Sequence, residues 1–197
     1  MALLQYFFPL LSNKYLFPFL EKIAAILKIP TITVSYGLAE IYKKNTGKKA
    51  DVIFSLPRVN LDVMHWPARN SNSSLFVYFG LIREDRLPIR ILDYIENNNL
   101  KIDIYGPYPK RISAGYKEKL NRLTLSGIIS FKGVYKPQEM AFVSEYRAVL
   151  MAYDCHSLNI VHALPNKLFQ ALLQGMQCIV SDDMEEALTR FSESRAV

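Results

Sequence analysis

Short apolar runs alternate with amphipathic segments along most of the chain. Runs rich in β-branched and aromatic residues predict strands. They fall at residues 75–79, 101–105, 128–131, 148–152 and 178–180. Segments with apolar residues three or four positions apart predict helices. They fall at residues 87–97, 116–125, 137–144 and 166–174. Repeated strand–helix units with apolar strands predict an α/β fold, in which a Rossmann-like parallel sheet carries helices on both faces.

The sequence predicts fewer helices and strands in the first part of the chain. Two helical segments are expected before Pro30, the second near residues 20–27, because prolines and polar residues interrupt the apolar pattern. A strand, a helix capped by Ser35 and a second strand are expected next, at residues 31–34, 37–44 and 51–55. Residues 57–73 lose all periodicity and are rich in proline, asparagine and serine, which predicts a linker and a domain boundary.

The first thirty residues are apolar and aromatic. No basic region precedes the apolar run, which argues against a secretory signal, and the run is too interrupted for a membrane span. One interpretation is a buried helix pair. The alternative is an interfacial patch with phenylalanines at lipid headgroups and lysines near anionic lipid. Its residues would be Phe7, Phe8, Phe17 and Phe19 with Lys14, Lys22 and Lys28.

The most informative segment, residues 164–181, predicts a loop, a short helix, a glycine stop and a strand. Pro165 favours a helix start and Gly175 a helix end. A helix N-terminus binds anions such as phosphate, and a cation such as Lys167 is unfavourable there unless an anion lies near it. Gln170 is able to exchange hydrogen bonds with a ribose, or is a plain surface residue. The segment therefore predicts a phosphate site.

Turns that contain glycine follow three of the predicted strands. The first turn contains Gly80, Arg83 and Arg86, and Gly106 and Gly133 follow the next two strands. Ligands bind outside the carboxyl ends of the strands in such sheets, and glycine lets the backbone approach them. Arginine offers a planar fork of donors to a phosphate. These turns predict an anion-binding cleft, with an ordinary solvated basic surface as the alternative.

Composition and missing motifs argue against several classes of function. The net charge is +6, but the basic residues are scattered rather than gathered in a stripe, which argues against nucleic-acid binding. The sequence contains no Walker-type glycine loop, no GxGxxG after the first strand and no GxSxG. Cys155 and Cys178 lie in or beside apolar runs and are expected to be reduced, buried and structural, which indicates the cytosol. His156 and His162 have no metal-ligand spacing, and His162 is a candidate for sugar binding or catalysis or a structural residue.

Four pieces of the chain, in the right order over residues 75–182, resemble the C-terminal, nucleotide-sugar-binding domain of GT-B glycosyltransferases. The resemblance is to the retaining family 4 type in particular. The pieces are Phe79-Gly80 through Arg86, Ile104-Tyr105-Gly106, Phe131-Lys132-Gly133-Val134-Tyr135, and Leu164 through Ser181. Arg86 stands where the family's phosphate-binding lysine falls.

The resemblance implies a domain organisation. Residues 1–56 would be a remnant of an N-terminal Rossmann-like domain, because residues 20–57 are similar to the end of that domain in the family. Residues 57–73 would be the hinge. Residues 74–197 would be the donor-binding C-terminal domain, incomplete at its end. Because most of the family's acceptor-binding region has no counterpart here, we expect the chain to be a fragment.

The resemblance also implies an activity. The enzyme would be a glycosyltransferase of the hexosyltransferase type. It would transfer a sugar with retention from a nucleotide-sugar, such as a UDP- or GDP-sugar, to a glycan or lipid-linked acceptor in cell-surface polysaccharide synthesis. It would need no metal or other cofactor, and would act in the cytoplasm or peripherally at the inner face of the membrane. Its donor-binding residues would be Gly80, Arg83, Arg86, Gly106, Tyr135, Asn166, Lys167 and Gln170.

Three residues depart from the family pattern. Gln170 stands where the family has glutamate, His162 where many members have the first of two paired glutamates, and Leu81 where an arginine often follows the first glycine. The departures favour an alternative function, a degenerate or truncated non-catalytic module that binds a nucleotide-sugar. A membrane-associated scaffold that uses the aromatic N-terminus is a third reading.

Overall fold

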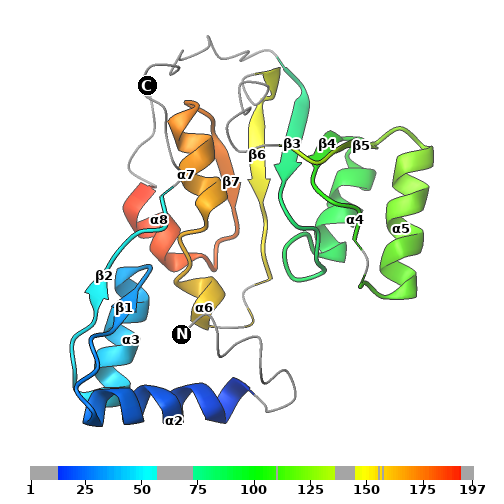
Figure 1. The fold of residues 1–197 in the computed structure, drawn as a ribbon. Coiled ribbons are helices and arrows are strands. Elements are labelled where there is room, and N and C mark those ends of the chain that lie inside the picture. The colour runs from blue at the N-terminus through cyan, green and yellow to red at the C-terminus, as the bar shows by residue number, and fades with distance from the viewer. Residues whose placement is uncertain are drawn as a thin grey trace. The chain divides into compact units, whose positions relative to one another are not determined.

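The computed structural model describes residues 13–56, 73–109, 111–135, 145–154, 156 and 158–191, and side chains from Pro18 onward. The chain divides into two compact units between Phe54 and Ser55, and each is described by itself (Figure 1). In the described part of the chain, every helix is too short or too polar to cross a membrane.

The first unit is built around one strand–helix–strand step. Its elements are α2 (Asn13–Ile26), β1 (Ile32–Thr33), α3 (Tyr36–Thr46) and β2 (Asp51–Val52). The two strands pair in parallel. Ser35 caps α3, as predicted, since its hydroxyl accepts a hydrogen bond from the Leu38 N–H at 3.3 Å. Gly47 closes the helix in the left-handed conformation at φ 70°.

Of the two helical segments predicted before Pro30, the one expected near residues 20–27 is observed as α2, which begins earlier, at Asn13, and residues 1–12 lie outside the described residues. One helix, α2, continues through Pro18. Proline removes one helical hydrogen bond and crowds the preceding turn, which disfavours a helix interior. Here α2 packs against α3 and buries Ala25, so tertiary packing maintains the helix across the proline. Phe19 is exposed, while the other phenylalanines of the predicted interfacial patch lie outside the described side chains.

The second unit contains a five-stranded sheet in which every pairing is parallel. Its strands are β3 (Leu75–Phe79), β4 (Lys101–Tyr105), β5 (Ile129–Gly133), β6 (Ala148–Met151) and β7 (Cys178–Val180). The order across the sheet is β5-β4-β3-β6-β7. Successive strands are added outward from β3 on one side and outward from β6 on the other, so the strand order reverses between β3 and β6. Ligands bind at such a switch point in doubly wound sheets. The predicted Rossmann-like α/β fold is confirmed.

Helices cover both faces of this sheet. They are α4 (Ile89–Asn97), α5 (Ala114–Leu125), α6 (Leu158–Val161), α7 (Asn166–Leu173) and α8 (Glu185–Phe191). The chain moves outward from β3 through α4 and α5, and outward in the opposite direction from β6 through α7 (Figure 1). Because such crossovers are right-handed, α4 and α5 lie on one face and α7 on the other. The helix predicted at residues 137–144 lies outside the described residues.

The main core lies between the sheet and the helices α4 and α5. Fully buried aliphatic and tyrosine side chains from both layers fill it. They include Tyr78, Leu87, Leu92, Ile102, Ile104, Tyr116, Leu120, Leu123 and Ile129. Cys178, at the edge strand, is a half-buried free thiol whose pKa is raised to about 12 by burial. Cys155 lies outside the described residues.

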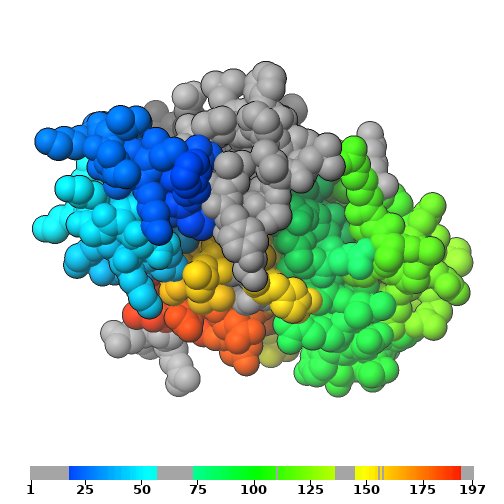
Figure 2. All heavy atoms as spheres, turned by 90° about the horizontal axis from the view of Figure 1, so that it is seen from below, coloured from blue at the N-terminus to red at the C-terminus, as the bar shows by residue number. Residues whose placement is uncertain are grey.

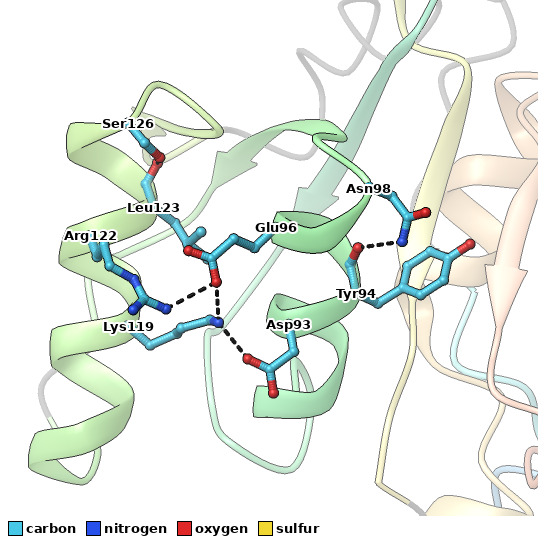
Figure 3. Close-up of polar contacts among 8 residues, drawn as sticks. All are labelled: Asp93, Tyr94, Glu96, Asn98, Lys119, Arg122, Leu123 and Ser126. Carbon is cyan, nitrogen blue, oxygen red and sulfur yellow. Dashed lines mark hydrogen bonds and ion pairs between the residues drawn. The ribbon is translucent and has the colours of Figure 1, made fainter.

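An ionic network joins α4 to α5 beside this core (Figure 3). The Lys119 ammonium donates to carboxylate oxygens of Asp93 and Glu96, the latter at 2.6 Å, and Arg122 reaches the same Glu96 oxygen at 3.0 Å. Burial alone would lower the pKa of Lys119, but its two carboxylate partners outweigh burial and raise it. The hydrogen bond from Lys119 lowers the pKa of Glu96. Both shifts favour the charged forms of Lys119 and Glu96 at neutral pH.

We expect Lys119→Met to lower the free energy of unfolding by about 1–2 kcal/mol, between the effects of exposed and buried ion pairs. Methionine keeps the aliphatic packing, but Asp93 loses its ammonium partner and Glu96 is left with Arg122 alone. Urea denaturation at neutral pH measures the change, with Lys117→Met on the exposed side of α5 as the control. Equal stability of the two variants would contradict a role for the network.

Candidate functional site

Three glycine turns meet where β3, β4 and β5 end. The Gly80 N–H donates to the Tyr105 carbonyl at 2.8 Å, and the Gly106 N–H donates to the Gly133 carbonyl at 2.7 Å. A Cβ on Gly106 would lie 2.1 Å from the Gly80 carbonyl oxygen, so these two turns touch through their backbones. Gly80 has φ +114°, a conformation that other residues rarely adopt. Both glycines are therefore required by the geometry of the turns.

The loops after β3 and β6 are tied to each other at the same end of the sheet. The Asp154 N–H donates to the Asp85 carbonyl at 2.8 Å. Figure 2 looks onto this end, and the yellow surface that follows β6 lies there against the green surface that follows β3. The carboxylates are engaged locally: Asp85 pairs with Arg83 at 2.9 Å, and Asp154 pairs with Arg90 at 2.7 Å. Each of these carboxylates therefore already has a basic partner.

Helix α7 begins at this end of the sheet, as its sequence predicts. Pro165 occupies the N-cap position in an extended conformation, Asn166 is the first helical residue, and Gly175 follows the helix with φ +64°. Leu168 and Ala171 are buried, and α7 packs along β7. Burial of this apolar face fixes the helix on the sheet, so its N-terminal N–H groups lie at the carboxyl ends of the strands.

Lys167 does not extend into solvent from the helix start. Its side chain is 7% exposed, and its Nζ lies 3.5 Å from where a Cβ on Gly80 would be. Three aromatic residues surround the ammonium, with ring centroids 4.0 Å (Tyr78), 5.3 Å (Tyr153) and 6.0 Å (Phe79) from Nζ. We call these three rings the aromatic ring set. Nζ has no hydrogen-bond partner among the described residues.

Two cations therefore lie together at the Gly80 turn. Arg86 is half-buried, and its guanidinium lies 5.9 Å from the centroid of the Tyr153 ring. No carboxylate within the described ranges forms an ion pair with Arg86 or Lys167. Burial, and to a lesser degree the charge of Arg86, lowers the pKa of Lys167 from the ordinary 10.5 to about 7. Arg86 supplies a positive charge at this turn, and Lys167 supplies a second one when it is protonated.

The other predicted donor-binding residues lie around this centre or beside it. Tyr135 packs edge-on against Phe79, with ring centroids 5.6 Å apart, which brings the turn after β5 next to the ring set. Arg83 is exposed and engaged by Asp85. Asn166 is exposed at the helix start, and Gln170 is half-buried one turn later. The structure thus brings together Gly80, Arg86, Gly106, Tyr135 and Lys167.

His162, the catalytic candidate, follows α6 directly. Its N–H donates to the Leu158 carbonyl at 3.0 Å, which gives the residue a place in the last turn of that helix. His156 lies 3.5 Å from a carboxylate oxygen of Asp154, so it belongs to the ion-paired loop after β6. The structure shows no contact that joins either imidazole to Lys167.

Sequence reasoning missed the aromatic ring set. Tyr78 and Tyr153 each lie at or just beyond the carboxyl end of an apolar strand. Because ligands bind at these ends, that position could have indicated that the two tyrosines line the site. Burial raises the pKa of Tyr153 to about 12 and that of Tyr78 still further, so both phenols stay neutral at physiological pH. Neutral rings attract the Lys167 ammonium through their π faces but do not cancel its charge.

The arrangement is suited to bind a compact polyanion. Two basic side chains, the positive end of a helix and the Gly80 turn converge at the point where strand order reverses. Helix N-termini and oriented backbone N–H groups stabilise phosphate, and a buried unpaired ammonium gains most from a new anionic partner. Gly106 keeps space for the Gly80 turn, so the anion site depends on both glycines.

Comparisons with known proteins support the fold. No family model matches the chain, and no curated protein matches it in sequence. Among solved structures, Staphylococcus aureus TarM, in complex with fondaparinux, α-GlcNAc-glycerol and UDP, aligns over 82% of this chain. The TM-score is 0.56 and the sequence identity 12%. The pneumococcal O-GlcNAc transferase GtfA, in complex with UDP and GlcNAc, aligns over 86% with a TM-score of 0.51 and 17% identity.

The alignments cover 31% of TarM and 33% of GtfA, so the chain spans about a third of the length of each. Both alignments have a TM-score above 0.5, so the chain shares the overall fold of the matched part of each structure. The resemblance first drawn from four sequence motifs is thereby confirmed at the level of the fold. In its architecture, this chain is similar to the GT-B glycosyltransferases.

Proposed function

We propose that the chain binds a nucleotide-sugar through its diphosphate and is the donor-binding part of a glycosyltransferase. One observation carries the proposal: Lys167 is buried and without a hydrogen-bond partner among the described residues, directly beside the Gly80 turn. Arg86 adds a second positive charge next to it. A diphosphate supplies the negative charge that the surrounding loops do not.

The same groups suit the chemistry of sugar transfer. The bond between the sugar and the diphosphate breaks with negative charge gathering on the leaving phosphate, so fixed positive groups stabilise the transition state. Arg86, Lys167 and the N-terminus of α7 are suited to that task, because the start of α7 and the contacts with the aromatic rings hold them at one end of the sheet. Tyr135 packs against Phe79 and the Gly133 turn bonds to the Gly106 turn, so we expect these residues to contact the nucleoside.

The finer parts of the proposal rest on relatedness of fold and on motif order. TarM and GtfA are both solved with UDP, which supports a nucleoside diphosphate as the ligand class. The motif order supports a family 4 type enzyme that retains stereochemistry, acts on a glycan or lipid-linked acceptor, and serves cell-surface polysaccharide synthesis on the cytoplasmic side. Donor turnover with a polysaccharide-type acceptor, and the anomeric configuration of the product, would test these parts.

Nucleotide binding tests the central proposal directly. We expect UDP or GDP to raise the melting temperature of the full chain, measured by differential scanning fluorimetry. A ligand at a hundred times its Kd stabilises by about 2.7 kcal/mol, which corresponds to a rise of about 5–10 °C for a chain of this size. In the double variant Arg86→Ala/Lys167→Met the rise should disappear, because both positive charges at the Gly80 turn are gone.

A matched control removes the same amount of charge elsewhere. Lys101 and Lys117 are both exposed, one at the start of β4 and one on α5. We expect Lys101→Ala/Lys117→Ala to keep the full nucleotide-dependent rise. If neither nucleotide shifts the melting temperature of the unmodified chain, or if the control loses the shift equally, the proposed diphosphate site is wrong.

A further inference from the structure

The Lys167 amine is held in surroundings that favour its neutral form when the site is empty. Its Nζ is enclosed by the aromatic ring set and the Gly80 turn, with only 7% of the residue exposed. An ammonium that loses its water without gaining a carboxylate is strongly penalised. Attraction to the faces of the rings recovers a part of that penalty. The geometry alone therefore makes protonation of this amine depend on what lies next to it.

The charged and titratable groups around Lys167 reinforce this dependence. On β3 and after β6, the neighbours are the phenols of Tyr78 and Tyr153, which burial keeps neutral. The loop after β3 contributes Arg86, whose charge opposes protonation of the amine, and Asp85, which is engaged by Arg83.

Three more groups lie on packed segments. The turn after β5 contributes Tyr135, which interacts with Tyr153 and whose pKa is raised by burial. The loop after β6 contributes Asp154, which is engaged by Arg90 and His156. From α5, Tyr116 faces Tyr78 and donates its hydroxyl to the Leu87 carbonyl, and burial raises its pKa as well. Arg86 is thus the neighbour whose charge is not balanced within the described surroundings. The negative charge of an anion at the Gly80 turn would outweigh the charge of Arg86 and favour the protonated form of Lys167.

We propose that a nucleoside diphosphate binding at the Gly80 turn brings one proton with it from solvent, which adds to the lone pair of Lys167 Nζ. The proposal deepens the proposed function and rests on it. The proton comes from water or buffer, no covalent bond to the ligand forms or breaks, and the new ammonium is balanced by the ligand's negative charge. Binding and protonation therefore favour each other.

The expected pH dependence follows from the sign of this linkage. With a pKa of about 7 in the empty site, Lys167 is mostly neutral above pH 7, and binding there must take up a proton. Affinity should fall by up to about tenfold per pH unit above this point. Below pH 7 the amine is already charged, so the dependence should flatten until the terminal phosphate itself protonates near about pH 6.

Isothermal titration calorimetry of the full chain with UDP and with GDP tests the proposal. Titrations in HEPES and in Tris, whose ionisation enthalpies differ, give the number of protons taken up per nucleotide. We expect a value approaching about one at about pH 8.5 and near zero at about pH 6.5. Lys167→Met should bind more weakly and take up no proton, whereas Lys117→Met should behave as the unmodified chain does.

The outcomes separate the two proposals. Binding of either nucleotide without proton uptake at about pH 8.5 would overturn the linkage and leave the diphosphate site standing. Undiminished proton uptake in Lys167→Met would overturn the assignment to this amine. Absence of binding by both nucleotides at every pH would overturn the proposed function, and the linkage with it.

Discussion

Replacing Gly106 with alanine is expected to destabilise the second unit by about 3 kcal/mol or more, at the upper end of what overpacking costs. The added Cβ would meet the Gly80 carbonyl oxygen at 2.1 Å, a distance that real Cβ atoms essentially never show. The obstacle is backbone rather than the end of a flexible side chain, so it cannot move alone. The turns after β3 and β4 would have to separate.

The same substitution should weaken nucleotide binding. The Gly80 turn carries the backbone that faces Lys167, and it is held to β4 by the hydrogen bond from Gly80 to Tyr105. Displacing the turn moves one wall of the proposed diphosphate site. We therefore expect both a lower urea midpoint and a smaller UDP- or GDP-dependent rise in melting temperature for Gly106→Ala.

Gly115→Ala is the matched control for this prediction. Gly115 lies in the first turn of α5, and a Cβ there meets nothing within 4 Å. Alanine is favoured over glycine in a helix by up to about 1 kcal/mol, so this variant should be as stable as the unmodified chain or more so. Equal stability of the two alanine variants would show that the two turns do not need their close approach.

Elements whose apolar runs end at a glycine could be predicted closely from the sequence. The strands β3 and β4 have the predicted bounds because Gly80 and Gly106 stop each run at its end. The helix α5 starts at Ala114, earlier than the predicted Tyr116, because the Ser113 hydroxyl caps it by accepting from the Tyr116 N–H. Capping serines set a helix start independently of the apolar period that was used to predict it.

The sequence pattern could not predict where a helix or strand ends when tertiary packing determines its length. The helix α2 crosses Pro18, and β2 ends at Val52, short of the predicted Ser55. Helix propensity and β propensity are weak priors that packing overrides. The short helices α6 and α8 also went unpredicted, because each is too brief to show a helical period.

The direction of the Lys167 side chain was beyond sequence reasoning for a related reason. The sequence places a lysine at a helix start, where it is expected to meet an anion from solvent. The rings that receive it come from Tyr78 and Tyr153, on two other elements whose approach depends on the sheet order. The motifs could therefore predict that residues 164–181 contribute a basic residue to a phosphate site. They could not predict that the Lys167 ammonium is buried among aromatic rings.

Lys167→Met is expected to raise the free energy of unfolding at pH 7 by about 2–3 kcal/mol. A pKa of about 7 in the fold, against 10.5 ordinarily, means that folding disfavours the ammonium. The difference corresponds to about 4 kcal/mol at pH 7, and attraction to the ring faces offsets about 1–2 kcal/mol of it. Methionine has a similar length, carries no charge and makes favourable contacts between its sulfur and aromatic rings.

The sign of the pH dependence distinguishes this explanation from better packing alone. Unfolded chains keep the lysine protonated up to about pH 10.4, whereas the folded chain releases the proton above pH 7. The cost of Lys167 is therefore complete below pH 7 and shrinks by about 1.4 kcal/mol for each pH unit above it. The stability advantage of Lys167→Met should shrink at the same rate between about pH 7 and pH 9, before the tyrosines begin to ionise.

Urea denaturation of Lys167→Met, Lys117→Met and the unmodified chain across this pH range provides the measurement. The exposed Lys117 should give no pH-dependent difference, because its surroundings are the same solvent in both states. A constant advantage of Lys167→Met at every pH would contradict a charge-based cost, and a loss of stability would contradict it altogether. If the advantage follows pH as expected and the same substitution weakens nucleotide binding, Lys167 lowers the stability of the empty fold and strengthens its hold on a diphosphate. A residue that lowers stability but raises ligand affinity is expected to serve binding, whereas a packing residue raises stability.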